Sequence, residues 1–219
     1  MASRPKTAEP RPAPGLYLIS PVLADPSGFA ALLNAALDAA DVAALLLRLA
    51  SADEGTLIKR AKAVAGAAQA RGVAVLLDGR PDLVARARAD GVHTTGLAAF
   101  TEAAEQLKPD GIVGAGGLLS RHDAMQAAEQ GADYVMFGEP DEQGARPGFA
   151  AIEERVAWWA EVFEAPCVGY AGAVEEVAPL VAAGADFVAL GDWLWSEPEK
   201  LPAMLGGVAR ALHLPEAIG

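Results

Sequence analysis

Short apolar runs that do not alternate with polar residues recur along this chain, and Ala-rich stretches separate them. Such a run is expected for a strand that is buried on both faces, as in a parallel sheet. The pattern predicts strands at residues 16–19, 44–48, 73–77, 91–93, 111–113, 134–137, 167–169 and 187–190. The stretches between them predict helices at residues 29–38, 56–71, 82–88, 101–107, 123–130, 151–163, 174–183 and 201–212.

Eight strand–helix units in 219 residues predict a single (β/α)₈ TIM barrel, with the barrel domain at residues 15–219. A doubly wound parallel sheet is the alternative, but no GxGxxG motif follows the first predicted strand, which weakens its dinucleotide-binding form. Residues 1–14 hold four prolines and three basic residues without an apolar stretch. We expect a disordered Pro/Arg-rich tail there rather than a signal peptide.

Aspartates precede five of the predicted strands, and several of them follow a glycine that suits a helix C-terminus. In a barrel the N-terminal ends of the strands form the face that serves stability rather than chemistry. These aspartates are therefore predicted to be structural: Asp41, Asp90, Asp110, Asp133 and Asp186.

The net charge of −12 limits the partners that we expect. Nucleic acids and anionic membranes are bound through clustered Lys and Arg, so neither is expected here. No apolar run approaches the roughly 20 residues that span a bilayer. A small anionic molecule stays compatible, because a local pocket can oppose the global field. The single cysteine, Cys167, is predicted to be a buried thiol, and without an internal disulfide the default expectation is the cytoplasm.

Chemistry in a barrel belongs to the C-terminal ends of the strands, and two of three catalytic candidates lie there. Arg48 ends the second strand, where its guanidinium can hold a phosphate or carboxylate; a rim salt bridge with Asp78 is the alternative. His93 ends the fourth strand and can take part in proton transfer, or pack at the rim. His122 lies near a helix start, where a solvated or capping role is favoured over catalysis.

Glycine-bearing turns after the fifth, seventh and eighth strands predict places for a phosphate. The first is the run of residues 114–117, and the others contain Gly172 and Gly191. Tight turns in a barrel need glycine in any case, which is the alternative explanation. Oxygen ligands for Mg²⁺ are available on Asp78, Glu139 and Asp192. No lysine falls at a predicted strand end, which argues against Schiff-base chemistry.

At these residues the chain resembles the thiamine phosphate synthase and TenI family of α/β barrels. The opening Gly-Leu-Tyr-Leu-Ile-Ser at residues 15–20 looks like the first strand of the family. Arg48 matches the arginine that ends its second strand, and Ala-Asp-Gly-Val-His at residues 89–93 looks like its fourth strand. Residues 131–135 and 184–190 resemble later units, so that the resemblance spans about residues 15–212.

The resemblance implies a substrate phosphate on Arg48 and a thiazole phosphate near Gly172, Ala173 and Gly191. Residues after the fifth strand complete this set of phosphate-binding candidates: Gly114, Gly116 and Ser120. The family synthase joins a pyrimidine pyrophosphate to a thiazole phosphate with Mg²⁺. Its lysine after the second strand aligns with Ala50, and its metal-binding aspartates align with Gly79 and near Ala98. Only Asp78 stays as a weak metal ligand.

A pyrophosphate leaving group needs cations to absorb its developing charge, and these departures remove them. The favoured interpretation is a barrel that binds a small phosphorylated, thiazole phosphate-like ligand, with the pyrophosphate and Mg²⁺ site largely lost. A synthase (a transferase) with rearranged residues is one alternative. A TenI-like isomerase is another, with His122 or His93 replacing a histidine that aligns near Leu119.

A third alternative is a non-catalytic barrel that acts in binding or assembly. Trp158 and Trp159 are adjacent on a predicted helix, where side chains point about 100° apart. The two rings therefore cannot both face one core, and one of them can cover a partner subunit. A homodimer stays open on this ground.

Overall fold

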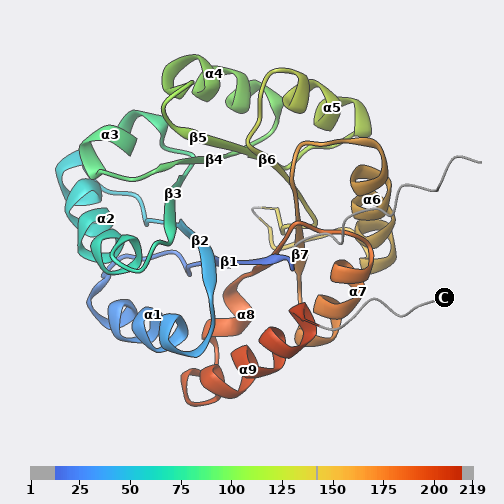
Figure 1. The fold of residues 1–219 in the computed structure, drawn as a ribbon. Helices are drawn as coiled ribbons and strands as arrows, with labels where there is room; N and C mark the ends of the chain where they lie inside the picture. Colours follow the sequence, from blue (N-terminus) through green and yellow to red (C-terminus); the bar gives the residue numbers. More distant parts are fainter. Residues whose placement is uncertain (1–12, 142, 214–219) are drawn as a thin grey trace, which may run out of the picture.

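The computed structural model describes residues 13–141 and 143–213, and its chain forms a closed barrel of eight parallel strands (Figure 1). The strands are β1 (Gly15–Ile19), β2 (Val42–Leu47), β3 (Ala74–Asp78), β4 (Gly91–Thr95), β5 (Ile112–Gly116), β6 (Tyr134–Phe137), β7 (Cys167–Ala171) and β8 (Phe187–Leu190). Each strand pairs with its neighbours in sequence, and β1 also pairs with β8. The predicted (β/α)₈ barrel is confirmed. The predicted tail falls almost wholly on residues 1–12, which lie outside the described residues.

Helices surround the barrel on all sides (Figure 1). They are α1 (Ser27–Ala39), α2 (Glu54–Gln69), α3 (Val84–Ala87), α4 (Leu97–Leu107), α5 (Arg121–Glu129), α6 (Phe149–Val162), α7 (Val177–Ala182), α8 (Asp192–Trp195) and α9 (Leu201–Leu212). Short 3₁₀ turns precede three of them: η1 (Pro81–Leu83), η2 (Val174–Glu176) and η3 (Pro198–Lys200). Within the described residues, no helix is long and apolar enough to cross a membrane.

Two helices differ most from the prediction. The helix α4 begins at Leu97, four residues before its predicted start, because Gly96 has a φ of 87° and turns the chain directly out of β4. The short helix α8 was not predicted, since it is a single turn after β8. Its Leu194 and Trp195 are buried, and the Trp195 indole N–H donates to the carbonyl of Ile19. This turn therefore joins the end of β8 to the end of β1.

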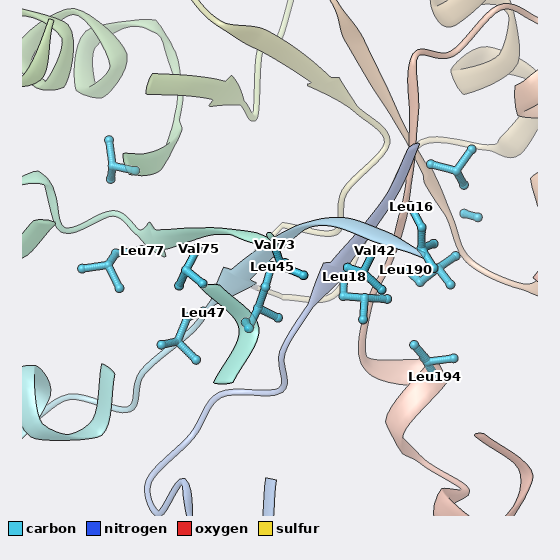
Figure 2. Packing of buried hydrophobic residues seen from close by; sticks show 14 of the residues in the cluster. Leu16, Leu18, Val42, Leu45, Leu47, Val73, Val75, Leu77, Leu190 and Leu194 are labelled. Atoms are coloured by element: carbon cyan, nitrogen blue, oxygen red, sulfur yellow. The ribbon is translucent and has the colours of Figure 1, made fainter. Parts of the chain in front are cut away.

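Two separate apolar layers hold the fold together. The larger layer lies between the outer face of the barrel and the helices, and Figure 2 shows Leu45, Leu47, Val75 and Leu77 of β2 and β3 in it. The smaller layer fills the inside of the barrel with residues from alternate positions of the strands. It includes three tyrosines, Tyr17, Tyr134 and Tyr170, so the interior carries hydroxyl groups as well as apolar side chains.

Three of the predicted structural aspartates each link two neighbouring strands by hydrogen bonds at the N-terminal face, an arrangement that we call an aspartate clasp. The side chain of Asp90, before β4, accepts a hydrogen bond from the Val75 backbone N–H of β3 at 2.7 Å. Asp133 and Asp186 repeat this arrangement, binding the first part of β5 and β7 respectively. In each case the aspartate's own N–H donates to the carbonyl of the same partner residue. The sequence interpretation of these three aspartates is confirmed.

Candidate functional site

Arg48 follows β2 directly, at the C-terminal mouth of the barrel, and is held by the end of β1. Its Nε donates to the Ser20 carbonyl at 2.7 Å, and its backbone N–H donates to the Ser20 hydroxyl at 2.9 Å. Its terminal nitrogen forms an ion pair with Asp192 at the start of α8. The suggested pairing with Asp78 is therefore wrong, because α8, and not β3, supplies the carboxylate. The guanidinium is about three-quarters buried, with its side chain 24% exposed.

His93 of β4 belongs to a chain of polar groups inside the barrel. Its Nδ1 lies 2.9 Å from the Tyr134 hydroxyl, which lies 2.8 Å from the Tyr17 hydroxyl. The imidazole is 2% exposed and stacks on the Tyr134 ring. His93 thus points into the barrel rather than across the rim. Its Nε2 faces the Glu139 carboxylate at 3.9 Å, too far for a hydrogen bond.

Burial controls the ionisation of this chain of hydroxyls. Desolvation raises the pKa of Tyr17 and of Tyr134 well above the usual value for tyrosine. The carboxylates of Asp78 and Glu139 raise both pKa values further. The hydroxyls are therefore neutral at physiological pH and act as hydrogen-bonding groups that orient the His93 ring.

The glycine turn after β5 is shorter than predicted, because the strand continues to Gly116. Gly114 is a strand residue, and a Cβ there would overlap the Tyr134 ring. At Gly116 a Cβ would overlap the Glu139 carboxylate and lie 2.6 Å from His93 Nε2. Of the predicted phosphate-binding turn at residues 114–117, only Gly117 lies outside the strand. Its N–H donates to Glu139 Oε1 at 2.5 Å.

The turn after β7 has the same construction. The backbone N–H of Gly172 donates to Glu176 Oε2 at 2.6 Å. The same oxygen accepts from Arg146 at 2.8 Å, a residue from the loop between β6 and α6. A Cβ on Gly172 would overlap the Arg146 guanidinium, so only glycine lets this side chain lie on the turn. Ala173 follows in extended backbone at the start of η2, half-buried.

The remaining predicted phosphate and catalytic residues are spread around the mouth. Gly191 is buried, and a Cβ there would meet the Tyr170 hydroxyl, so its first role is to make room for that ring. Ser120 is exposed and caps α5 through a reciprocal pair of bonds with Asp123. His122 is exposed in the first turn of the same helix, and the structure does not bring it to His93.

The carboxylates considered for Mg²⁺ do not converge. Glu139 is bonded to the Gly117 N–H, Asp192 is paired with Arg48, and Asp78 stands exposed at the end of β3. Across residues 13–141 and 143–213 there is no group of three or more His, Cys, Asp or Glu side chains placed to hold a metal. The described carboxylates therefore do not by themselves form the Mg²⁺ site that the resemblance implies.

Sequence reasoning missed Arg146, Glu176 and Tyr134. All three lie away from the residues that immediately follow a strand, which is where candidates were sought. Arg146 reaches the mouth because Asp141 folds its loop, accepting from the backbone N–H groups of Gln143 and Ala145. The signal in the sequence was weak: an arginine in a Gly/Pro-rich loop, and a glutamate four residues after a turn glycine.

The sequence of this chain is similar to those of known proteins. The sequence profile of the family described as thiamine monophosphate synthase matches residues 16–193. The chain belongs to the thiamine monophosphate synthase family. The matched region covers nearly all the segments that carried the resemblance, from β1 to β8.

Individual members of the thiamine monophosphate synthase family are similar over nearly the whole chain. The thiamine-phosphate synthase of Rhodospirillum centenum is 45% identical over 201 residues, covering 90% of this chain and 97% of its own. That of Hyphomonas neptunium is 41% identical, covering 88% of this chain and 91% of its own. The solved thiamine phosphate pyrophosphorylase of Pyrococcus furiosus has the same fold, with a TM-score of 0.73, 19% identity and coverage of 90% and 95%.

Proposed function

We propose that this member of the thiamine monophosphate synthase family binds a small phosphorylated, thiazole phosphate-like ligand at the barrel mouth. The observation that carries the proposal is the pair of glycine turns after β5 and β7, whose N–H groups each already hold a carboxylate oxygen. A backbone N–H that donates to one oxyanion, in a mouth that also holds a cation, can donate to another. The family's phosphorylated substrates make a phosphate the expected oxyanion.

The mouth favours a single phosphate over a pyrophosphate with Mg²⁺. Three of its arginines already have a carboxylate partner: Arg48 has Asp192, Arg80 has Asp82, and Arg146 has Glu176. The lysines described by the structure lie elsewhere, on α2, at the end of α4 and at η3. Little unpaired positive charge is left to stabilise the negative charge that develops on a leaving pyrophosphate. Transfer chemistry requires this stabilisation.

An active synthase is the second candidate, and one observation favours it. The relatives named thiamine-phosphate synthase are up to 45% identical along most of this chain. If the reaction is retained, Arg48 would hold a substrate phosphate and Asp78 would be the carboxylate nearest to the lost metal positions. This arrangement would have to work with Ala50 and Gly79 where the family places a lysine and an aspartate.

One experiment separates the two candidates. The pure protein is incubated with pyrimidine pyrophosphate, thiazole phosphate and Mg²⁺, and thiamine phosphate is followed; in parallel, thermal unfolding is measured with thiazole phosphate alone. We expect no turnover, and stabilisation by about 2.7 kcal/mol at a ligand concentration of about one hundred times Kd. Turnover that disappears in Arg48→Ala would establish the synthase instead. The absence of both turnover and stabilisation would refute ligand binding of this kind.

A further inference from the structure

One ring nitrogen of the buried His93 has no hydrogen-bond partner among the described residues. The imidazole is 2% exposed, and its Nδ1 lies 2.9 Å from the Tyr134 hydroxyl. Its Nε2 lies 3.9 Å from the Glu139 carboxylate, whose Oε1 already accepts from the Gly117 N–H at 2.5 Å. Buried polar atoms are nearly always paired in proteins, so a ring nitrogen without a partner marks a place where a ligand can bind.

This nitrogen lies at the mouth of the barrel. A Cβ on Gly116, the last residue of β5, would lie 2.6 Å from Nε2 and would overlap the Glu139 carboxylate. Nε2 therefore faces the space over the C-terminal end of β5, the end of a barrel strand where ligands bind. The Glu139 side chain beside it is 16% exposed, so this space opens towards solvent.

Two buried tyrosines decide which ring nitrogen of His93 carries the hydrogen. Burial raises the pKa of Tyr17 and of Tyr134, so both hydroxyls keep their hydrogens at neutral pH. The Tyr17 hydroxyl lies 2.8 Å from that of Tyr134, and the described residues offer it no other partner. A buried hydroxyl hydrogen without an acceptor costs free energy, so Tyr17 donates to Tyr134. The Tyr134 hydrogen then points to the acceptor that remains within reach, Nδ1 of His93.

This order of donors fixes the tautomer of His93. A neutral imidazole has one nitrogen that accepts and one that carries a hydrogen. Because Nδ1 accepts from Tyr134, the ring hydrogen lies on Nε2 and points into the space over Gly116. The opposite order, from His93 through Tyr134 to Tyr17, would leave the Tyr17 hydrogen without an acceptor in the described part of the chain. The imidazole also stacks on the Tyr134 ring at an interplanar angle of 10°, which fixes the direction of this N–H.

We propose that Tyr17 and Tyr134 are positioning residues that hold His93 as the Nε2–H tautomer, and that this N–H donates to an uncharged acceptor of the ligand, a ring nitrogen or a carbonyl oxygen. This inference rests on the proposed function and specifies which part of the ligand lies over the end of β5. The Glu139 carboxylate, 3.9 Å from Nε2, repels an anionic oxygen at this point. An uncharged acceptor is therefore favoured over a phosphate oxygen here.

The tautomer is measured directly in the wild-type protein. With ¹⁵N-labelled histidine, long-range proton–nitrogen correlation spectra distinguish the two neutral tautomers at about pH 8.5, where an ordinary imidazole is uncharged. His93→Gln identifies the signals of His93 by their absence, and we expect them to show the Nε2–H pattern. An Nδ1–H pattern would overturn the inference.

Two tyrosine variants assign the tautomer to the chain of hydroxyls. In Tyr134→Phe the His93 Nδ1 loses its hydrogen-bond donor, and we expect a mixture of the two tautomers. Tyr170→Phe is the matched control, because it removes a hydroxyl from the same interior layer but outside the chain, and it should leave the pattern unchanged. The same pattern in Tyr134→Phe as in the wild type would overturn the positioning role.

The ligand contact is tested with thiazole phosphate in the same labelled protein. Saturating ligand should shift the Nε2–H signal of His93 and leave that of the exposed His213 in place. His93→Leu removes the donor and should raise the Kd about tenfold, and His93→Gln, which keeps an amide N–H close to that position, should recover part of the loss. An unshifted His93 signal at saturation, or a wild-type Kd in His93→Leu with native circular dichroism, would overturn the inference.

The outcome is separable from that of the proposed function. If thiazole phosphate stabilises the wild type but His93 shows the Nδ1–H pattern or an unshifted signal, the inference fails and the proposed function stands. If thiazole phosphate has no effect and His93 shows the Nε2–H pattern, the proposed function fails and the positioning of His93 by Tyr17 and Tyr134 stands.

Discussion

Gly116 shows how one missing side chain shapes the barrel mouth. A Cβ at this position would overlap the Glu139 carboxylate and press on the His93 ring. Both neighbours are buried or partly buried, and His93 is held from behind by Tyr134. The space above Gly116 is therefore what allows Glu139 to reach the Gly117 N–H.

We predict that Gly116→Ala destabilises the barrel by about 1–3 kcal/mol, because the added methyl group forces these side chains apart. Urea unfolding gives the change in free energy. Gly66→Ala is the matched control: it lies on the exposed face of α2, with nothing within 4 Å of an added Cβ. This substitution should stabilise the protein by about 0.5–1 kcal/mol. Equal effects at the two glycines would contradict the packing described for the mouth.

The sequence predicts which residues lie at the strand ends, but it does not predict which side chains pair with one another. Arg48 was placed correctly after β2, yet its partner Asp192 is 144 residues away, and the choice among distant carboxylates depends on the closed barrel. Arg146 and Glu176 escaped notice because their meeting depends on how the loop after β6 folds back. Loops of this kind are set by local hydrogen bonds, here those of Asp141, that no periodic pattern encodes.

At the scale of elements, the aspartate clasps join the strands in pairs. Asp90, Asp133 and Asp186 link β3 to β4, β5 to β6 and β7 to β8. Each aspartate carboxylate accepts a hydrogen bond from a backbone N–H of the neighbouring strand. Each thereby holds the register of the two strands at their N-terminal ends. The clasps lie at the opposite end of the strands from the mouth, so stability and ligand binding are spatially separate.

Asp90→Ala is expected to cost about 1–3 kcal/mol, because the buried Val75 N–H loses its acceptor. The free energy of unfolding in urea measures this loss. Asp110→Ala, at an exposed position before β5, is the control and should change stability by less than about 0.5 kcal/mol. Phosphate binding should be unchanged in both variants. A loss at Asp110 as large as that at Asp90 would argue against the clasp.

Periodicity predicted the elements well because the fold repeats one unit. The ends of β6 and β8 coincide with the prediction, whereas β5 runs to Gly116, three residues beyond its predicted end at residue 113. Glycines are poor strand formers, so the run Gly-Ala-Gly at residues 114–116 reads as a turn. In the barrel these glycines are tolerated because Tyr134 and Glu139 fill the space that their side chains would take.

At the scale of the whole molecule, the barrel interior should keep its tyrosines neutral in alkaline solution. Burial raises the pKa of Tyr17, Tyr134 and Tyr170, the three tyrosines of the chain. Below about pH 10 the hydroxyls are protonated in both the folded and the unfolded state, so they add no pH dependence. Above it the unfolded state loses protons that the folded state keeps, and stability falls as the pH rises.

The ultraviolet absorbance of tyrosinate tests this expectation. We predict little ionisation in the folded protein at pH 11, followed by a cooperative rise that coincides with the loss of circular dichroism. A gradual rise centred near pH 10, with native circular dichroism, would contradict the buried Tyr17–Tyr134–His93 chain.

We propose that this mouth keeps a site for one phosphate and lacks one for pyrophosphate with Mg²⁺. The most direct measurement is a calorimetric titration of thiazole phosphate into the protein, repeated in the presence of inorganic pyrophosphate and Mg²⁺. We expect thiazole phosphate to bind with the same affinity with and without these additions. Tighter binding of thiazole phosphate in their presence, or Mg²⁺-dependent binding of pyrophosphate alone, would contradict it.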